Sequence, residues 1–161
     1  MSEPQNLLLG EFRRTIDERF RLSIPSELMN QLGVEKPQFI LAKERPGCLS
    51  LWLADALQTK LNEGMDLVRS KLEAGRLHER TAQVQLLGRL LSTRHKPAQL
   101  TGRGRLLIPE GFREFLRAEP NSDLTVVGAA VCIEIWHPAA WLEYLESRMP
   151  RFRKLFDNLS S

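Results

Sequence analysis

The sequence predicts an α+β protein that contains two copies of one β-rich unit, and three observations lead to this prediction. Arg21 is matched by Arg105 and Trp52 by Trp136, and both pairs are separated by the same interval along the chain, called here the repeat interval. A constant interval over this span indicates a tandem repeat without an insertion inside either copy. Each copy alternates short apolar runs with turn residues, which is typical of strands and hairpins. Between the copies, a proline-free stretch carries its apolar residues at helical spacing.

The first copy is expected to begin with a hairpin. Residues 1–10 are predicted to form a short tail that leads into the first strand. Apolar and polar residues alternate over 11–16 and again over 21–24, and the polar segment 17–20 separates the two runs. Two short strands around a tight polar turn are therefore predicted.

A short helix and a second hairpin complete the first copy. Pro25 precedes a predicted two-turn helix over 26–32, because the fixed φ of proline suits the first helical turn. Gly33 is expected to end this helix. Compact strands are predicted over 39–42 and 49–52, with a proline-glycine turn signal between them.

The stretch from 54 to 91 is predicted to form two amphipathic helices. Gly75 divides the stretch, and the second helix is expected over 77–91. The apolar residues at helical spacing are Leu57, Leu61, Met65, Val68, Leu72, Val84, Leu87 and Leu91. These helices could cover the β core or contact a neighbouring subunit, and the sequence does not distinguish the two arrangements.

The second copy repeats the order of the first. Residues 99–108 are expected to form a hairpin whose turn uses Gly102 and Gly104, because glycine adopts positive φ without a steric penalty. A short helix over 110–116 is predicted to follow Pro109.

Two further strands and a helix are predicted to end the chain. The strands are expected over 123–127 and 131–136, and the helix over 139–149. The apolar residues expected to face inward from this helix are Trp141, Leu142 and Leu145. The basic residues that follow are expected to form a solvated face or tail.

Composition and charge narrow the functional classes. Of the 161 residues, 42% are hydrophobic and 27% are charged, as in ordinary folded domains. No apolar run is long enough for a membrane span, and the first residues lack the pattern of a signal peptide, so a cytoplasmic location is expected. The net charge of +3 is too small to identify a nucleic-acid partner, so the distribution of charge carries more information.

Arginines gather where each copy begins. They are Arg13, Arg14, Arg19 and Arg21 in the first copy, and Arg103 and Arg105, preceded by Arg94 and Lys96, in the second. His95 is expected to add partial charge to the second group. Planar guanidinium groups suit contacts to phosphates and to guanine edges, so we expect double-stranded DNA as a partner. The alternative is a pair of solvated basic strand edges.

The sequence contains no arrangement that supports catalysis. The three histidines are far apart and have no cysteine or carboxylate at metal-ligand spacing, so no metal or cofactor is expected. Residues 102–105 lack the ending of a phosphate-binding loop. We therefore expect a protein that is not an enzyme and that has no small-molecule substrate.

The two cysteines, Cys48 and Cys132, are also separated by the repeat interval, and each lies within an apolar run. We expect two small, buried strand residues that stay reduced in a cytosol. The alternative is that the two thiols approach each other across a pseudo-twofold axis.

The doubled motif resembles the MraZ family of bacterial transcriptional regulators, which contain two SpoVT-AbrB-like repeats per chain. The resemblance rests on Asp17-x-x-x-Arg21-Leu-Ser-Ile-Pro25 with Trp52, and on Arg105-Leu-Leu-Ile-Pro109 with Trp136, and it covers nearly the whole chain. The Asp-x-x-x-Arg element binds DNA in that family. It is intact in the first copy, whereas Thr101 stands where the second copy of the family has aspartate. In the first copy, Arg19 and Phe20 stand where the family has lysine and glycine.

The resemblance implies a pseudo-twofold split β-barrel with a helical insert and a C-terminal helix. The units it implies are a first repeat over 10–57, an insert over 58–93, a second repeat over 94–140, and a C-terminal helix and tail over 141–161. It also implies a ring-shaped homo-oligomer at the nucleoid. Such a ring binds short direct repeats upstream of the division and cell-wall operon, including the protein's own promoter.

The resulting hypothesis is that all six arginines of the two turns and the first strand project from one face toward DNA. Asp17 is expected to orient Arg21 through a bidentate pair. One alternative is an assembly module in which the arginines pair with acidic residues such as Glu18 or Glu27. Another is an AbrB-type antitoxin, which would bind a toxin through a disordered tail, although little chain follows Met149.

Overall fold

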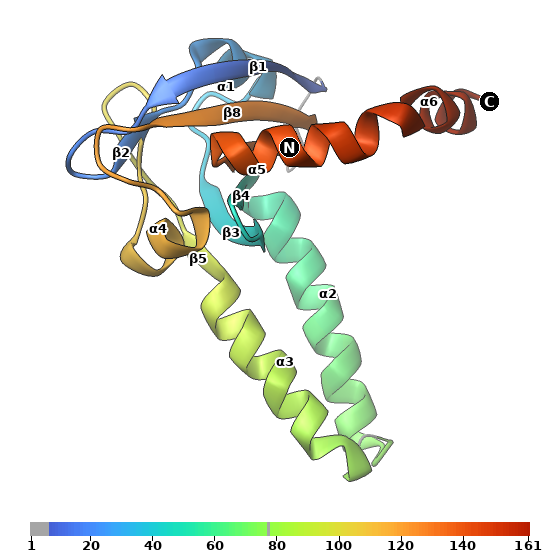
Figure 1. The fold of residues 1–161 in the computed structure, drawn as a ribbon. Helices are drawn as coiled ribbons and strands as arrows, with labels where there is room; N and C mark the ends of the chain where they lie inside the picture. Colours follow the sequence, from blue (N-terminus) through green and yellow to red (C-terminus); the bar gives the residue numbers. More distant parts are fainter. Residues whose placement is uncertain (1–6, 77) are drawn as a thin grey trace.

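A computed structural model describes residues 7–76 and 78–161, which form antiparallel sheets accompanied by helices (Figure 1). In chain order the elements are β1 (Leu8–Thr15), β2 (Arg21–Ser23), α1 (Ser26–Leu32), β3 (Phe39–Arg45), β4 (Cys48–Leu53), α2 (Ala54–Glu73), the 3₁₀ helix η1 (His78–Arg80), α3 (Thr81–Arg94), β5 (His95–Pro97), β6 (Gln99–Thr101), β7 (Arg105–Leu107), α4 (Glu110–Leu116), β8 (Asp123–Ala130), β9 (Ile133–Trp136), α5 (Pro138–Arg148), the 3₁₀ helix η2 (Met149–Arg151) and α6 (Phe152–Ser160). The α+β prediction is confirmed. The described strands do not close into a barrel, and the split barrel of two repeats stays a prediction.

The larger sheet interleaves the two halves of the chain. Its order is β1-β8-β9-β4-β3-β5, and each neighbouring pair is antiparallel. Phe39 of β3 and Asp123 of β8 begin their strands one repeat interval apart, and the two strands lie second from opposite edges. Elements separated by the repeat interval therefore occupy equivalent places in the sheet.

The smaller sheet has the order β2-β7-β6 and also joins the two halves. Leu22 of β2 lies opposite Leu106 of β7, and both side chains are fully buried. They belong to one core with residues from both halves, among them Leu28, Leu49, Leu116 and Ile135. Burying each such side chain stabilises the fold by roughly 1.5–3 kcal/mol. Because this core takes side chains from both halves, neither half supplies its core alone.

The hairpin predicted over 11–24 is wrong. β1 pairs with β8, whereas β2 pairs with β7 in the other sheet. The Ile16 N–H donates to the Ser122 carbonyl at 2.9 Å, which continues the pairing of the first strand with the second half of the chain. Local alternation identifies both strands correctly, but it cannot tell which partner each strand will choose.

The corresponding hairpin in the second half is confirmed. β6 and β7 pair with each other, and Thr101 lies opposite Arg105. Gly102 and Gly104 adopt φ of 55° and 86° in the turn between them, as their sequence positions predict. The hairpins β3–β4 and β8–β9 are likewise formed by the predicted segments.

The two short helices have the predicted bounds. α1 follows Pro25 and ends at Gly33, whose φ of 67° is left-handed. α4 follows Pro109, but its left-handed terminal residue is Arg117, with φ of 60°. Both helices are therefore marked in the sequence by the preceding proline and by buried apolar residues at helical spacing. Glycine follows only the first of the two helices.

α2 and α3 project from the sheets as an antiparallel pair (Figure 1). Leu61, Met65 and Val68 of α2 face Leu87 and Leu91 of α3 across a narrow cleft. None of the described residues in either helix is buried. The two predicted helices are confirmed, but the second begins at Thr81, after a 3₁₀ turn, and position 77 lies outside the described residues, as do positions 1–6 of the predicted tail.

The C-terminal segment differs from prediction in two ways. In α5, Trp141 packs against Trp136, with ring centroids 5.1 Å apart, but Leu142 is 60% exposed, so its predicted inward position is wrong. The next residue along a helix lies about 100° further round, so Leu142 does not share the partly buried position of Trp141. The segment expected to be a solvated face or tail is exposed throughout 151–161, but it is a helix, α6, whose apolar residues recur at i, i+3, i+4 and i+7. They are Phe152, Leu155, Phe156 and Leu159, and all are exposed.

Across the described part of the chain, no helix combines the length and the apolar character that a membrane crossing requires.

Candidate nucleic-acid interface

β2 and β7 bring the two predicted arginine motifs together. In their antiparallel register, Arg21 lies opposite Leu107, and Arg105 lies opposite Ser23. Residues two apart on a strand share a face, so Arg21 and Arg105 are diagonal neighbours on the same face of this pair of strands. The opposite face holds the buried leucines of the core.

Two equivalent backbone hydrogen bonds join each turn to the other half of the chain. The Ile24 N–H donates to the Gly104 carbonyl at 2.9 Å, and the Ile108 N–H donates to the Phe20 carbonyl at 3.0 Å. Ile24 and Ile108 are one repeat interval apart, and so are Phe20 and Gly104. Because β2 and β7 are antiparallel, the turn before β2 lies at one end of the β2–β7 ribbon and the turn before β7 lies at the other end.

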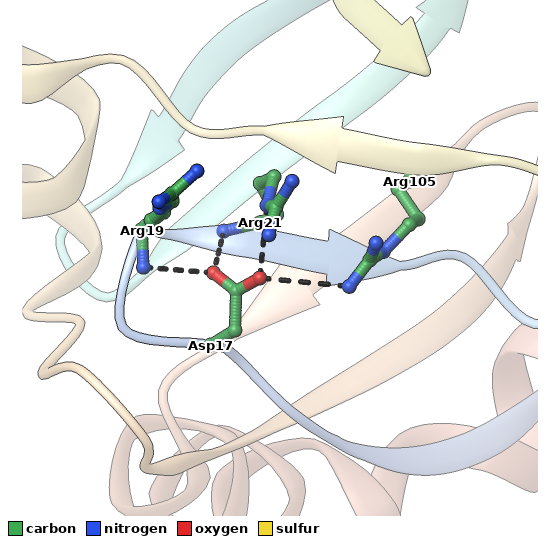
Figure 2. A network of polar contacts seen from close by, with 4 residues as sticks. All are labelled: Asp17, Arg19, Arg21 and Arg105. Atoms are coloured by element: carbon green, nitrogen blue, oxygen red, sulfur yellow. Dashed lines mark hydrogen bonds and ion pairs between the residues drawn. The ribbon is translucent and has the colours of Figure 1, made fainter. Parts of the chain in front are cut away.

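Asp17 lies in the first turn and contacts Arg19, Arg21 and Arg105 (Figure 2). Its Oδ1 accepts hydrogen bonds from the N–H of Arg21 at 2.8 Å and from the N–H of Arg19 at 2.9 Å. Its Oδ2 accepts from Nε of Arg21 at 2.9 Å and lies 3.6 Å from Nη2 of Arg105. The Asp17–Arg21 pair therefore joins one backbone and one side-chain hydrogen bond, in place of the expected bidentate guanidinium pair.

These contacts favour the ionised carboxylate. The Arg21 backbone N–H is the main reason that the pKa of Asp17 lies below its ordinary value, against an opposing effect of burial, and the Arg19 N–H and the Arg21 guanidinium lower it further. The side chain of Asp17 is 28% exposed, and that of Arg105 is 47% exposed. The cluster is thus open to solvent on one side, where a ligand could reach the arginines.

The remaining turn residues are exposed. Arg19 lies in the first turn and Arg103 in the second, and both side chains face solvent. Thr101 is exposed on β6, opposite Arg105. Asp17 therefore contacts Arg19, Arg21 and Arg105, and Thr101 lies opposite Arg105, whereas Arg103 lies in the turn at the other end of the ribbon.

Arg13 and Arg14 are not part of this cluster. They are neighbours on β1, so their side chains point to opposite faces of the strand. Arg13 lies 3.9 Å from the Asp123 carboxylate, and Arg14 donates to the Arg13 carbonyl while its guanidinium covers the Phe12 ring. The six predicted arginines therefore do not share one face.

Phe20 occupies the turn with a left-handed φ of 60°. Its ring packs against the core, and the Arg113 guanidinium lies 4.1 Å from the ring centroid. Arg113 also donates from Nε to the Ile108 carbonyl at 2.7 Å. Phe20 thus anchors the first turn to α4, a contact that the sequence did not reveal.

His95 does not add charge to the second arginine group. It lies on β5, which pairs with β3 in the larger sheet, and burial together with the adjacent Arg94 lowers its pKa. Its ring is therefore largely neutral at neutral pH. Arg94 itself donates a hydrogen bond to the Lys43 carbonyl of β3 at 2.7 Å, so its side chain contacts the larger sheet.

The cysteines are buried and free. Burial raises the pKa of Cys132 to about 12 and raises that of Cys48 further. The expectation of two small buried residues is confirmed, although Cys132 lies just before β9 rather than within a strand. Among the described residues, no group of three histidine, cysteine or acidic side chains could hold a metal ion.

Comparison with known proteins agrees with the resemblance of the motifs. The model of a family described as "MraZ protein, putative antitoxin-like" matches residues 97–158. A protein of Syntrophomonas wolfei subsp. wolfei named transcriptional regulator MraZ is 26% identical over 153 residues, which cover 95% of this chain and 96% of that protein. The chain is similar to MraZ proteins over nearly its whole length.

Other MraZ relatives give the same result. The Pediococcus pentosaceus protein is 28% identical over 153 residues, covering 95% of this chain and 96% of that protein. The Clostridium acetobutylicum protein is 29% identical over 141 residues, covering 88% and 89%. Both are named transcriptional regulator MraZ, and the matches extend across both halves of this chain.

One contact in this chain could not be predicted from the sequence. Asp17 contacts Arg105, which belongs to the other half of the chain. The motif pairs Asp17 with Arg21 four residues later and leaves Arg105 without an acidic partner, because Thr101 replaces the aspartate. The missing aspartate indicated that Arg105 needs an acidic partner from elsewhere in the chain. The pairing of β2 with β7, which supplies Asp17 as that partner, was not predictable.

Proposed function

We propose that this MraZ-family protein is a transcriptional regulator that binds double-stranded DNA through the turns at 17–21 and 101–105. The observation that carries the proposal is the meeting of Arg21 and Arg105 on one face of β2–β7, with Asp17 between them (Figure 2). Two exposed arginines, Arg19 and Arg103, lie in the turns at the two ends of this pair of strands. The motif resemblance and the names of the relatives support the same function.

The chemistry of the cluster suits two kinds of DNA contact. Arg19 and Arg103 lie in exposed turns and would neutralise phosphates, which positions a protein on the duplex without reading its sequence. Arg21 and Arg105 have their guanidinium groups partly held by a carboxylate. A held guanidinium loses less freedom on binding, and it suits bidentate contact to a guanine in the major groove.

The protein is further proposed to act as a ring-shaped homo-oligomer on short direct repeats upstream of the division and cell-wall operon, including its own promoter. This part rests on the family resemblance. Exposed apolar residues on α2, α3 and α6 are compatible with contacts between subunits. Several turn pairs on one ring would raise affinity for tandem sites through effective concentration, provided that the spacing of the sites matches the ring. Cytoplasmic location and association with the nucleoid follow from this role.

We also propose that the two halves are copies of one unit arranged as a split barrel, with bounds near 10–57 and 94–140, an insert over 58–93 and a C-terminal segment over 141–161. The supporting observation is that elements separated by the repeat interval lie at equivalent places in the larger sheet, while β2 and β7, also one repeat interval apart, pair with each other in the smaller sheet.

The test is fluorescence anisotropy of the full chain with its own upstream DNA and with a scrambled duplex, between about 50 and 200 mM salt. Arg21→Ala and Arg105→Ala are expected to reduce the preference for upstream DNA. Arg69→Ala, on the distant helix α2, is the matched control because its guanidinium only pairs with Asp66 on the same helix. Equal binding of both duplexes that is unaffected by either turn variant would overturn the proposal.

An assembly module without DNA binding is the second candidate. The exposed apolar faces of the projecting helices favour it as a separate possibility. This candidate predicts that the oligomer forms but that no salt-dependent binding of DNA is detected. An antitoxin that uses a disordered tail has less support, since residues 152–160 form the helix α6.

A further inference from the structure

The two arginine motifs of this chain are unequal in sequence. Asp17 stands four residues before Arg21, whereas Thr101 stands four residues before Arg105. Thr101 carries no charge and lies opposite Arg105 on the neighbouring strand. A reading of each motif by itself would therefore leave Arg105 without an orienting carboxylate.

The fold supplies that carboxylate from the other half. Oδ2 of Asp17 lies 3.6 Å from Nη2 of Arg105 and accepts from Nε of Arg21 at 2.9 Å. Among the residues that the structure describes, Asp17 is the one acidic side chain within ion-pair distance of Arg105. One oxygen atom therefore faces both guanidinium groups (Figure 2).

The strand register makes this sharing necessary. Arg21 and Arg105 are diagonal neighbours on one face, so their like charges repel. A carboxylate between them offsets that repulsion and restricts both guanidinium groups. The Oδ1 atom is at the same time held by two backbone N–H groups of the turn, which fixes the carboxylate itself.

We propose that Asp17 is the positioning residue for Arg105 as well as for Arg21, so that the two halves form one composite DNA-contacting site with a single central carboxylate. This inference rests on the proposed DNA-binding function and adds to it a dependence between the halves. Substituting Asp17 affects both arginines, and the second half depends on the first for its orientation.

The first test needs no DNA. The pKa of the Asp17 carboxyl is measured by NMR titration in the wild-type chain, in Arg105→Gln and in the control Arg103→Gln. An opposite charge within about 4–6 Å lowers the pKa of a carboxyl group, so loss of the Arg105 charge is expected to raise that of Asp17. Arg103→Gln removes an equal charge from the same turn and is expected to change it less. An unchanged pKa in Arg105→Gln would overturn the inference.

The second test uses Asp17→Asn, whose amide oxygen can still accept both turn N–H groups, so the turn is retained. Loss of a negative charge by itself strengthens non-specific DNA binding. The measured quantity is therefore the ratio of affinities for upstream and scrambled DNA. We expect this ratio to fall by about tenfold, within the discrimination that a good arginine contact provides.

A double-mutant cycle tests whether the effect passes through Arg105. Asp17→Asn is expected to lower the ratio less in the Arg105→Gln background than in the wild type, because coupled residues are not additive. Thr101→Asp in the Asp17→Asn background places a carboxylate opposite Arg105 and is expected to restore part of the ratio. Additive effects together with no recovery would overturn the inference.

The two tests separate the two proposals. A wild-type chain that binds both duplexes equally overturns the DNA-binding function, and with it the DNA-facing role of Asp17. The titration then still decides whether Asp17 holds Arg105. Sequence-preferring binding with an additive cycle leaves the function standing and removes the composite site.

Discussion

Phe20 and Gly104 occupy equivalent turn positions and share the left-handed backbone region, with φ of 60° and 86°. The carbonyl of each accepts an N–H from the strand of the other half. Glycine adopts this conformation without strain, whereas phenylalanine is held there by its packing against the core and Arg113. The two turns thus reach one geometry by different means.

Gly104→Ala is expected to lower the free energy of unfolding by about 1 kcal/mol, because a Cβ is strained at this φ while its nearest neighbours, on Met29 and Ile24, lie at ordinary van der Waals distances. The measurement is urea unfolding followed by circular dichroism. Gly88→Ala is the matched control, since Gly88 lies inside α3 with open space around it, and alanine favours helix by roughly 0.5–1 kcal/mol. Equal effects of the two substitutions would contradict the strain at Gly104.

Asp17 is expected to make stability depend on acid pH. Its pKa in the folded protein lies below the ordinary value of 3.8, so its contribution is complete well above that value and is lost as pH falls through the folded pKa. The stability difference between the wild type and Asp17→Asn should therefore narrow from pH 6 toward pH 3. Urea titrations at several pH values measure this difference, and a constant gap would argue against an ionised, hydrogen-bonded Asp17.

Glu134→Gln is expected to raise the free energy of unfolding at pH 7, by no more than about 1–2 kcal/mol. Burial is the main cause that raises the pKa of Glu134, so its charged form is disfavoured in the folded protein. The amide oxygen can still accept the Trp136 indole N–H, which is 3.0 Å from the carboxylate. Because a raised carboxyl pKa makes the wild type gain stability as pH falls, the advantage of the variant should shrink in acid.

Glu11→Gln is the control for that substitution. Glu11 also accepts an indole N–H, from Trp141 at 2.9 Å, but it is exposed. Its replacement should change stability little at any pH. A similar gain in both variants would mean that burial of the Glu134 charge is not the cause.

The two thiols are expected to be inert in the folded protein. Both are buried, and the raised pKa, about 12 for Cys132, leaves almost no thiolate at pH 8. Ellman's reagent should therefore react slowly in buffer and with both cysteines in urea. Rapid reaction of either thiol without denaturant would show that the region around β4 and β9 opens readily.

The proposed ring predicts a measurable effect of the exposed face of α6. Phe152 and Phe156 are 63% and 58% exposed, so their joint replacement by glutamate should leave the core intact. The native mass is expected to fall in native mass spectrometry while the thermal midpoint of the β core is retained. Asn158→Glu with Ser160→Glu adds the same charge to the same helix as a control, and an unchanged mass in the phenylalanine variant would exclude this face from assembly.

Most elements could be predicted from the sequence, because their signals are local. Pro25 and Pro109 mark the starts of two helices, and Gly102 and Gly104 mark one turn. The partner of β1 was not predictable, since alternation describes one strand and pairing is a competition among several. The regular spacing of apolar residues in α6 was present in the sequence, but the basic residues between them fit a solvated tail equally well.

The candidate site was predictable only in its components. Arg21 and Asp17 are four residues apart and form a local motif. The contact of Asp17 with Arg105 depends on the register of β2 and β7, which no local pattern encodes. The opposite orientations of Arg13 and Arg14 followed from the strand assignment itself, because neighbouring strand residues face opposite sides.

The interleaved sheet has a consequence for synthesis on the ribosome. Leu8 pairs with Ala130, and every residue of β1 pairs with a residue in the last third of the chain. The nascent first half therefore exposes unpaired strand edges until β8 has emerged, and such long-range pairing is slow to form. Residues 54–73 and 81–94 emerge in the meantime as the helices α2 and α3, which form from local contacts, so they delay closure of the sheet without competing for its edges.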